Sequence, residues 1–153
     1  MKISVQAEPF DYGILSNAFA QGHTHVGAVV TFCGIVRDDE LGGLSTMEIE
    51  HYPGMTEKAI KAHAETAKDR FSLAEVLVIH RYGSLKPGEM IMMVATAAPH
   101  RNDAFQGAEF LMDYLKSRAP FWKKEIVNGE PRWVDAKPED EDAYHVGKSL
   151  FGC

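Results

Sequence analysis

Apolar residues first cluster at positions 26–36, where the sequence VGAVVTFCGIV is β-branched and apolar on both faces. Such a run is typical of a strand covered on two sides, and it predicts a strand in the middle of a sheet. The following residues 37–43 (RDDELGG) are polar and glycine-containing, which predicts a loop. A second strand is expected over 45–51.

The pattern then changes to the period of a helix. Residues 52–57 (YPGMTE) open a helix that runs to about Arg70, with charged residues on its solvent side. Two strands are expected next, at 74–82 and 89–97, joined by a turn around the KPG sequence at 86–88. The two strands should form a hairpin.

The clearest amphipathic helix starts near Pro99 and ends by Ala119-Pro120, because proline excludes the residue before it from helical geometry. Strands at 121–127 and 132–134 then flank Asn128-Gly129, the strongest hairpin sequence in the chain. The apolar stripe of the helix consists of Ala104, Ala108, Leu111, Met112, Leu115 and Ala119.

Interleaved helices and hairpins predict an α+β (mixed α/β) fold with a mostly antiparallel sheet and flanking helices. The chain has no glycine-rich strand-to-helix loop of the dinucleotide or P-loop type. A chain of 153 residues has the length expected for a domain with one hydrophobic core. We expect a single domain over 1–137 and an acidic, loosely ordered tail over 138–153, where the sequence begins PEDED.

Charge and composition exclude several classes of function. Sixteen Lys+Arg against 22 Asp+Glu give a net charge of -6, which disfavours a nucleic-acid-binding surface. No apolar run reaches the roughly 18 to 20 residues of a membrane span, and the start MKISVQAEPF lacks the zones of a signal peptide. We therefore expect a cytoplasmic protein with no membrane or nucleic-acid partner, whose anion sites are local.

Two lysines flank an apolar corner near the end of the long helix. Lys116 lies at the edge of the apolar stripe, and Lys123 follows the corner at Pro120 in a strand with bulky neighbours. A partly desolvated lysine beside another cation can act as an acid, a base or a nucleophile, and two can hold a phosphate. The alternative is a solvated surface, with Lys116 favoured by the helix dipole.

His100 and Arg101 form a second cationic cluster at the start of the same helix, where free N–H groups favour anions. They lie about 24 Å from Lys116 at 1.5 Å per residue, too far to share one small ligand within one chain. Either two sites exist or a symmetric dimer joins the two helix ends, and we prefer the dimer. Arg37, on a loop after a strand, is a further candidate.

Other candidates are weaker. His23 and His25 form an H-x-H pair without a third ligand, so no metal site is predicted, and no cofactor motif is present. Cys33 is expected to be a small apolar residue buried in its strand, and Cys153 is terminal. Two cysteines are too few for a disulfide framework.

Several longer segments of the sequence are informative as whole motifs. The segments FCGIVRDDE, IEHYPGMTEKAI, VIHRYGSLKPGE, PHRNDAF and FLMDYLKSRAPFWKKE, followed by RWVDAK, stand in this order. Together they closely resemble the MoaE family, the large catalytic subunits of molybdopterin synthase. The resemblance covers about residues 26–137, and it is specific because several long motifs agree in order and spacing.

The resemblance implies an α/β hammerhead fold and a sulfurtransferase of molybdenum cofactor biosynthesis, with the catalytic site in residues 1–137. In that family, cyclic pyranopterin monophosphate receives two sulfurs and becomes the dithiolene of molybdopterin. The donor is the thiocarboxylated C-terminal glycine of a small ubiquitin-like carrier. The assembly is a heterotetramer, built on a homodimer of large subunits with one carrier at each end.

The resemblance also assigns residues by motif. Lys116 and Lys123 match the catalytic lysines, and Arg37 matches a substrate-binding arginine. His100 and Arg101 match residues that the neighbouring large subunit adds to the pocket. The remaining substrate-binding positions are Phe32 and Met112, which line the site, and Lys137, where lysine in place of arginine loses bidentate phosphate contact.

Two other functions stay open from the residues. A non-catalytic scaffold could use the same cations to grip a partner's terminal carboxylate, and binding without turnover would identify it. A phosphate-ester hydrolase is the second, although neither paired carboxylates nor a metal cluster supports it.

Overall fold

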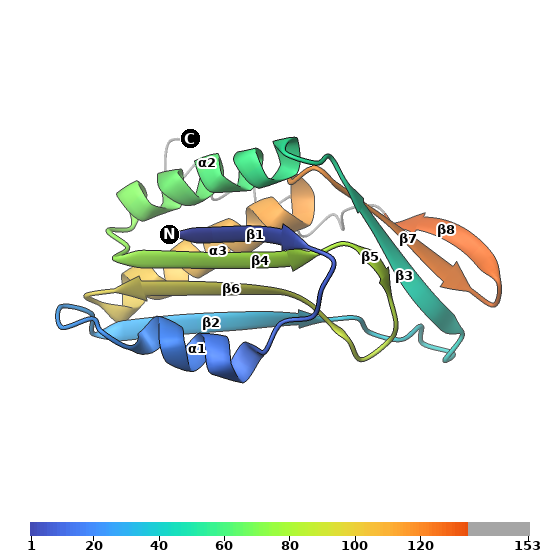
Figure 1. Ribbon diagram of the computed structural model, residues 1–153, viewed down its shortest axis with the longest axis horizontal. Coiled ribbons are helices and arrows are strands. Elements are labelled where there is room, and N and C mark those ends of the chain that lie inside the picture. Colours follow the sequence, from blue (N-terminus) through green and yellow to red (C-terminus); the bar gives the residue numbers. More distant parts are fainter. Residues whose placement is uncertain (135–153) are drawn as a thin grey trace.

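The computed structural model describes residues 1–134 and forms three helices and eight strands (Figure 1). No helix in this part of the chain is long and apolar enough to cross a bilayer. The elements are β1 (Lys2–Gln6), α1 (Tyr12–Ala20), β2 (Ala28–Ile35), β3 (Leu44–His51), α2 (Met55–Arg70), β4 (Glu75–Arg81), β5 (Gly83–Leu85), β6 (Met90–Ala98), α3 (Arg101–Ser117), β7 (Phe121–Val127) and β8 (Glu130–Val134).

The first sheet has the strand order β1-β4-β6-β2. Only the β1–β4 pair is parallel, and the β4–β6 and β2–β6 pairs are antiparallel. The side chains of the two central strands, β4 and β6, are almost all buried, as their continuous apolar sequences require. The predicted pairing of β4 with β6 is confirmed, and so is the α+β class.

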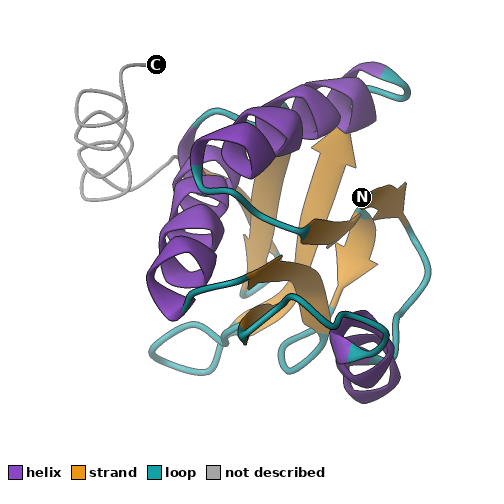
Figure 2. Cartoon of the chain, turned by 90° about the vertical axis from the view of Figure 1, so that its left-hand side faces the viewer, coloured by secondary structure: helices purple, strands orange, loops and turns teal. Residues whose placement is uncertain are grey.

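Helices cover both faces of this sheet. Figure 2 shows α2 and α3 side by side on one face and the shorter α1 on the other. Alternate residues of β4 therefore enter different cores. Val76 and Val78 pack in the large core with α2 and α3, whereas Leu77 and Ile79 pack under α1.

The second sheet, of order β5-β3-β7-β8, lies at the end of the first (Figure 1). Strands β7 and β8 form the predicted hairpin. Its two turn residues, Asn128 (φ 51°) and Gly129 (φ 80°), both have positive φ, as a tight two-residue hairpin turn demands. This sheet carries Lys123 toward the first sheet.

The prediction that 26–36 lies in the middle of a sheet is wrong, because β2 is an edge strand. The strand is apolar on two faces because α3 covers one side and α1 covers the other, where the Tyr12 and Thr31 hydroxyls share a hydrogen bond of 2.7 Å. Apolarity reports how the faces of a strand are covered, and it carries no information on whether a neighbour pairs with the strand edge.

Three elements were not anticipated from the sequence: β1, α1 and β5. Two of these elements, β1 and α1, have sequence features that indicate them. Ile3 and Val5 alternate with polar residues in β1, and Asp11 caps α1 by accepting a 2.9 Å hydrogen bond from the N–H of Ile14. Strand β5 has only three residues and interrupts the expected β4–β6 turn to pair with β3.

Thr56 connects the start of α2 to the corner before β7. Its side chain is fully buried. The hydroxyl accepts a hydrogen bond of 2.9 Å from the N–H of Tyr52 and donates one of 3.0 Å to the carbonyl of Pro120. Because β7 begins at Phe121, this contact fixes the point from which the strand carrying Lys123 departs.

Replacing Thr56 by valine keeps the shape of the side chain and removes both hydrogen bonds. We expect the free energy of unfolding to fall by roughly 1–3 kcal/mol, because two partly buried backbone groups lose their partner. Urea unfolding measures the change. Thr66→Val is the matched control, because its hydroxyl only bonds back to the Ala62 carbonyl in its own helix, and a change there of less than about 0.5 kcal/mol is expected. Equal effects would contradict the assignment.

Candidate functional site

The floor of the candidate site is a row of residues across three strands of the first sheet. The register pairs His80 of β4 with Met92 of β6, and Met92 with Gly34 of β2. The three side-chain positions face α3. At Gly34 a Cβ would approach the Met92 side chain to 3.1–3.2 Å, so the absence of a side chain keeps this part of the floor low.

The walls come from α3 and β7. Met112, Leu115 and Lys116 of α3 and Lys123 of β7 line a cavity of about 30 Å³ over this floor, together with Ile35 and Ile91. Two of the predicted site residues from different elements, Lys116 and Lys123, thus meet at one cavity, with Met112 beside them. Its volume suits the reacting end of a ligand rather than a whole pterin.

His80 was not singled out from the sequence as a site residue, yet it forms one end of the cavity floor. Only 2% of it is exposed. Its ring stacks on Phe121 at 3.8 Å between centroids, and its Nδ1 lies 2.8 Å from the backbone carbonyl of Arg81. Burial first, and then the charges of Lys123 and Lys116, lower the pKa of His80 to about 3.

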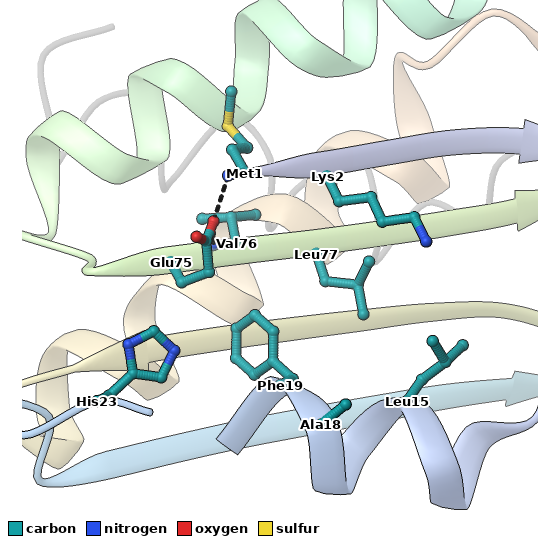
Figure 3. Close-up of a pocket in the computed structure, with 9 residues that line it drawn as sticks. All are labelled: Met1, Lys2, Leu15, Ala18, Phe19, His23, Glu75, Val76 and Leu77. Carbon is teal, nitrogen blue, oxygen red and sulfur yellow. Dashed lines mark hydrogen bonds and ion pairs between the residues drawn. The ribbon is translucent and has the colours of Figure 1, made fainter. Parts of the chain in front are cut away.

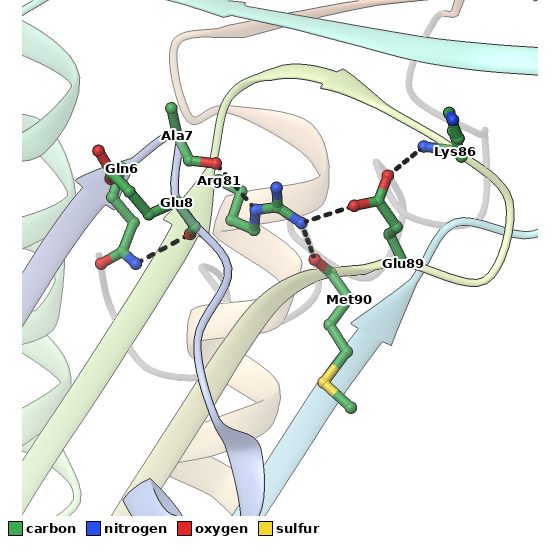
Figure 4. Close-up of polar contacts among 7 residues, drawn as sticks. All are labelled: Gln6, Ala7, Glu8, Arg81, Lys86, Glu89 and Met90. Atoms are coloured by element: carbon green, nitrogen blue, oxygen red, sulfur yellow. Dashed lines mark hydrogen bonds and ion pairs between the residues drawn. The ribbon is translucent and has the colours of Figure 1, made fainter.

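Arg81, the last residue of β4, holds the loop beside His80 in place (Figure 4). Its guanidinium donates to the carbonyl of Ala7 at 3.1 Å and to that of Met90 at 3.2 Å, and it pairs with the carboxylate of Glu89 at 3.4 Å. Glu89 in turn accepts a hydrogen bond from the N–H of Lys86. The Arg81 charge is therefore compensated within the fold. These contacts also hold the end of β4, next to His80, in place.

His100 and Arg101 lie at the opposite end of α3 from Lys116, exposed to solvent. The helix has 17 residues, which sets the two clusters about 24 Å apart at 1.5 Å per residue. The structure therefore does not bring these two residues into the cavity of their own chain. The prediction that the two clusters lie at opposite ends of one helix is confirmed.

Phe32 of β2 and Arg37 are not among the residues that line the cavity. Phe32 is partly exposed, and its ring lies 3.6 Å from where a Cβ of Gly34 would stand. Arg37 is exposed on the loop after β2, two residues beyond Ile35. Lys137 and the predicted tail over 138–153 lie outside the described residues.

The other cations of the corner point elsewhere. Lys124 lies on the opposite face of β7 from Lys123, as the strand period predicts, and its ammonium sits 5.5 Å from the centre of the Trp133 ring. Arg118 is the exposed C-cap residue of α3. Of the four cations around this corner, two reach the cavity.

Cys33 is half-buried, so the prediction of a buried thiol is wrong. The reason is the edge position of β2, which leaves one side of the strand without a neighbouring strand. The remaining burial raises the pKa of the thiol, which keeps it protonated and a poor nucleophile.

A larger cavity, of about 340 Å³, lies away from the lysines, between α1 and the strands β1 and β4 (Figure 3). It is lined mainly by apolar side chains such as Leu15 and Phe19. The ammonium of Met1 there already pairs with Glu75 at 2.5 Å, so its charge is compensated. We assign the chemistry to the smaller cavity because two cations converge there.

His23 borders the larger cavity, and residues 1–134 hold no group of three or more potential metal ligands.

The fold and the site define an α+β protein with a lysine-lined cavity suited to a small anionic group. Residues 5–118 match the family described as "MoaE protein". The chain belongs to the MoaE family.

Proteins named as molybdopterin synthase catalytic subunits are closely similar to this chain in sequence. The chain is 62% identical to the molybdopterin synthase catalytic subunit of Cereibacter sphaeroides over 143 residues, covering 94% of this chain and 97% of that one. It is 51% identical to the same subunit of Ralstonia nicotianae, covering 92% and 81%. The solved molybdopterin biosynthesis MoaE protein of Burkholderia ambifaria superposes with a TM-score of 0.80 at 45% identity, over 95% of this chain and 96% of that one.

Burial of a neutral histidine makes stability depend on pH. His80 titrates at 6.5 in the unfolded chain and at about 3 in the folded protein, so between these values only the unfolded state binds its proton. The contribution is fully present above about pH 6.5 and is lost as pH falls. The ring of His63 stacks on Phe110 and Tyr114, and its pKa is lowered to about 4. Its burial therefore also makes the folded protein less stable as the pH falls.

We expect His80→Gln to reduce the slope of unfolding free energy against pH between about pH 6 and pH 4 by up to ~1.4 kcal/mol per unit. Urea unfolding at a series of pH values measures this slope. His25→Gln, at an exposed position, is the control and should leave the slope unchanged. An unchanged slope in His80→Gln would show that the imidazole is not held neutral.

Proposed function

We propose that this chain is the catalytic subunit of a molybdopterin synthase. It transfers sulfur from the thiocarboxylated C-terminal glycine of a small ubiquitin-like carrier to cyclic pyranopterin monophosphate, and two transfers give the dithiolene of molybdopterin. In each transfer the carrier exchanges its thiocarboxylate sulfur for oxygen and leaves as a carboxylate. The observation that carries the proposal is the meeting of Lys116 and Lys123 at one cavity. The names of the relatives quoted above support it.

Charge complementarity favours this reaction. The phosphorylated pterin and the thiocarboxylate are both anionic, whereas the protein as a whole carries -6. Attraction must therefore come from cations placed close to the reacting atoms. Lys123 is partly buried there, and Lys116 is exposed. The cavity provides two such cations over a floor of His80, Met92 and Gly34, and none of its lining residues is acidic.

The two lysines take different roles in the proposal. Lys116, at the mouth of the cavity, transfers a proton or transiently holds the glycyl carbonyl while the sulfur leaves. Lys123, with Arg37 on the loop after β2, stabilises the phosphate and the developing oxyanion. Cys33 carries no sulfur in this scheme, because its raised pKa disfavours the thiolate.

The size of the cavity supports a pocket shared between two copies of the chain. About 30 Å³ can admit the terminal atoms of the carrier, so the pterin lies over the mouth. His100 and Arg101 of a neighbouring large subunit complete the pocket there, and Phe32 and Met112 supply its apolar wall. Lys137 adds a further charge. The assembly is a homodimer of large subunits with a carrier at each end.

We also propose a single catalytic domain and a cytoplasmic location. Residues 1–137 form the catalytic domain, and the acidic segment 138–153 follows it as a tail. The reaction takes place in the cytoplasm, in keeping with the -6 charge and the absence of a membrane-spanning helix from residues 1–134.

Reconstitution tests the reaction. The protein, a thiocarboxylated carrier and cyclic pyranopterin monophosphate are mixed, and dithiolene formation is followed. Lys116→Ala and Lys123→Ala should each lower the rate on the order of 100-fold or more, as expected for loss of a group that handles protons or developing charge. Lys61→Ala on the exposed side of α2 is the matched control and should keep the wild-type rate.

Two results would count against the enzyme. Full turnover by Lys116→Ala would remove that lysine from the mechanism. A stable complex with the carrier and no product from the wild type would leave the scaffold function, in which the same cations only bind a terminal carboxylate.

Mixing two inactive variants tests the shared pocket. If each pocket combines Lys116 of one subunit with Arg101 of its neighbour, mixed dimers of Lys116→Ala and Arg101→Ala contain one intact pocket of two. Random exchange should then restore about a quarter of wild-type activity, since half of the dimers are mixed. The measurement is activity after subunit exchange, with each variant alone as the control. No recovery, with exchange verified by mass, would place both residues in the same subunit's pocket.

A further inference from the structure

Strand β2 (Ala28–Ile35) has an unpaired edge. It is the last strand of the first sheet, and within residues 1–134 no strand pairs with its outer side (Figure 1). We propose that this edge pairs antiparallel with the same edge of a second copy, so that the two sheets continue into one another across a twofold axis. The inference deepens the shared pocket proposed above and rests on that function.

The edge of β2 lacks the features that keep sheet edges from pairing. Its sequence, AVVTFCGI, contains no charged residue and no proline, and its eight residues make it a long strand. Phe32 and Ile35 are exposed along it, by 39% and 55%. The opposite edge strand of the sheet, β1, has five residues and begins with Lys2. Of the two edges, β2 is therefore the one suited to association with another strand.

The two ends of β2 lie at the two cationic clusters. At its start, Ala28 pairs with Ala98, three residues before Arg101 opens α3. At its end, Ile35 lines the cavity together with Lys116. Eight residues span about 26 Å at roughly 3.3 Å each, close to the separation of about 24 Å between the two ends of α3. One strand thus reaches from one cluster to the other.

Antiparallel pairing reverses the second strand, so the start of β2 in one copy lies beside the end of β2 in the other. His100 and Arg101 of the second copy then lie near Ile35 and the cavity that holds Lys116. The twofold axis repeats this arrangement, and two equivalent pockets form. A parallel arrangement would place each cluster beside its own copy and would complete neither pocket.

Symmetry restricts the register of the pair. Residues opposite each other in a sheet point to the same face, and the faces alternate along a strand. One residue must therefore lie on the axis and face its own copy, and the two nearest the middle of β2 are Thr31 and Phe32. The hydroxyl of Thr31 already shares a hydrogen bond with Tyr12 of α1, whereas Phe32 is partly exposed. We place Phe32 on the axis, because a cross-strand pair of phenyl rings buries apolar surface of both copies.

Disulfide trapping tests this pairing without turnover. Phe32→Cys is made in a chain that also carries Cys33→Ser and Cys153→Ser. Under mild oxidation it should form covalent dimers at least ~10-fold faster than Ser4→Cys in the same background, because only Phe32 opposes itself across the axis. Ser4 is the matched control, since it lies on the other edge strand, β1. Cys33 as the only cysteine should also react slowly, because it opposes Thr31 of the second copy.

A charge at the axis tests the same edge in solution. Phe32→Arg places two guanidinium groups opposite each other, and we expect the dissociation constant of the dimer to rise on the order of 100-fold in sedimentation experiments. The position is partly exposed, so the monomer should fold, and urea unfolding checks this. Trp122→Arg is the control, because Trp122 is similarly exposed, by 41%, on the second sheet. That variant should remain a dimer.

The outcomes separate the pairing from the reaction. A dimeric wild type in which Phe32→Cys forms no disulfide, or in which only Trp122→Arg dissociates, would overturn the pairing and leave the proposed reaction standing. A monomeric wild type would overturn both the pairing and the shared pocket, and loss of carrier binding in Phe32→Arg would then assign the edge to the carrier. Trapped dimers together with a wild type that makes no dithiolene would overturn the proposed function alone.

Discussion

The stacking of Phe121 on His80 is the contact on which the site depends, because it joins the two sheets. His80 belongs to a central strand of the first sheet, and Phe121 begins the strand of the second sheet that carries Lys123. The corner before Phe121 is fixed in turn by the hydrogen bond from Thr56 to Pro120. A lysine from one sheet and a lysine from a helix over the other thus meet at one place.

The same burial that builds this junction determines its electrostatics. Exclusion of water strengthens the field of fixed charges and makes a second charge on the imidazole costly. The pKa of His80 falls to about 3, and the cavity keeps two lysines beside a neutral imidazole in a protein of net charge -6. Two cations outside the cavity are paired within the fold: Arg81 with Glu89, and the Met1 ammonium with Glu75.

Much of this architecture follows from local sequence. The end of the helix before Pro120 and the hairpin at Asn128-Gly129 were predicted because proline and positive-φ turn residues restrict the backbone directly. The lysine pair followed from the same corner. The edge position of β2 and the half-burial of Cys33 could not be read in this way, because strand order is set by long-range pairing. His80 was missed for a related reason: its place in the cavity depends on Phe121 and Lys123, more than forty residues away in sequence and adjacent only after folding.

The central claim is that the small cavity between Lys116 and Lys123 receives the reacting end of the sulfur donor. A crystal structure of the chain with its carrier would test it most directly. The account predicts the terminal glycine of the carrier inside this cavity, with its carboxylate within hydrogen-bonding distance of a lysine ammonium. A terminus bound elsewhere, such as in the larger cavity between α1 and β4, would contradict the account.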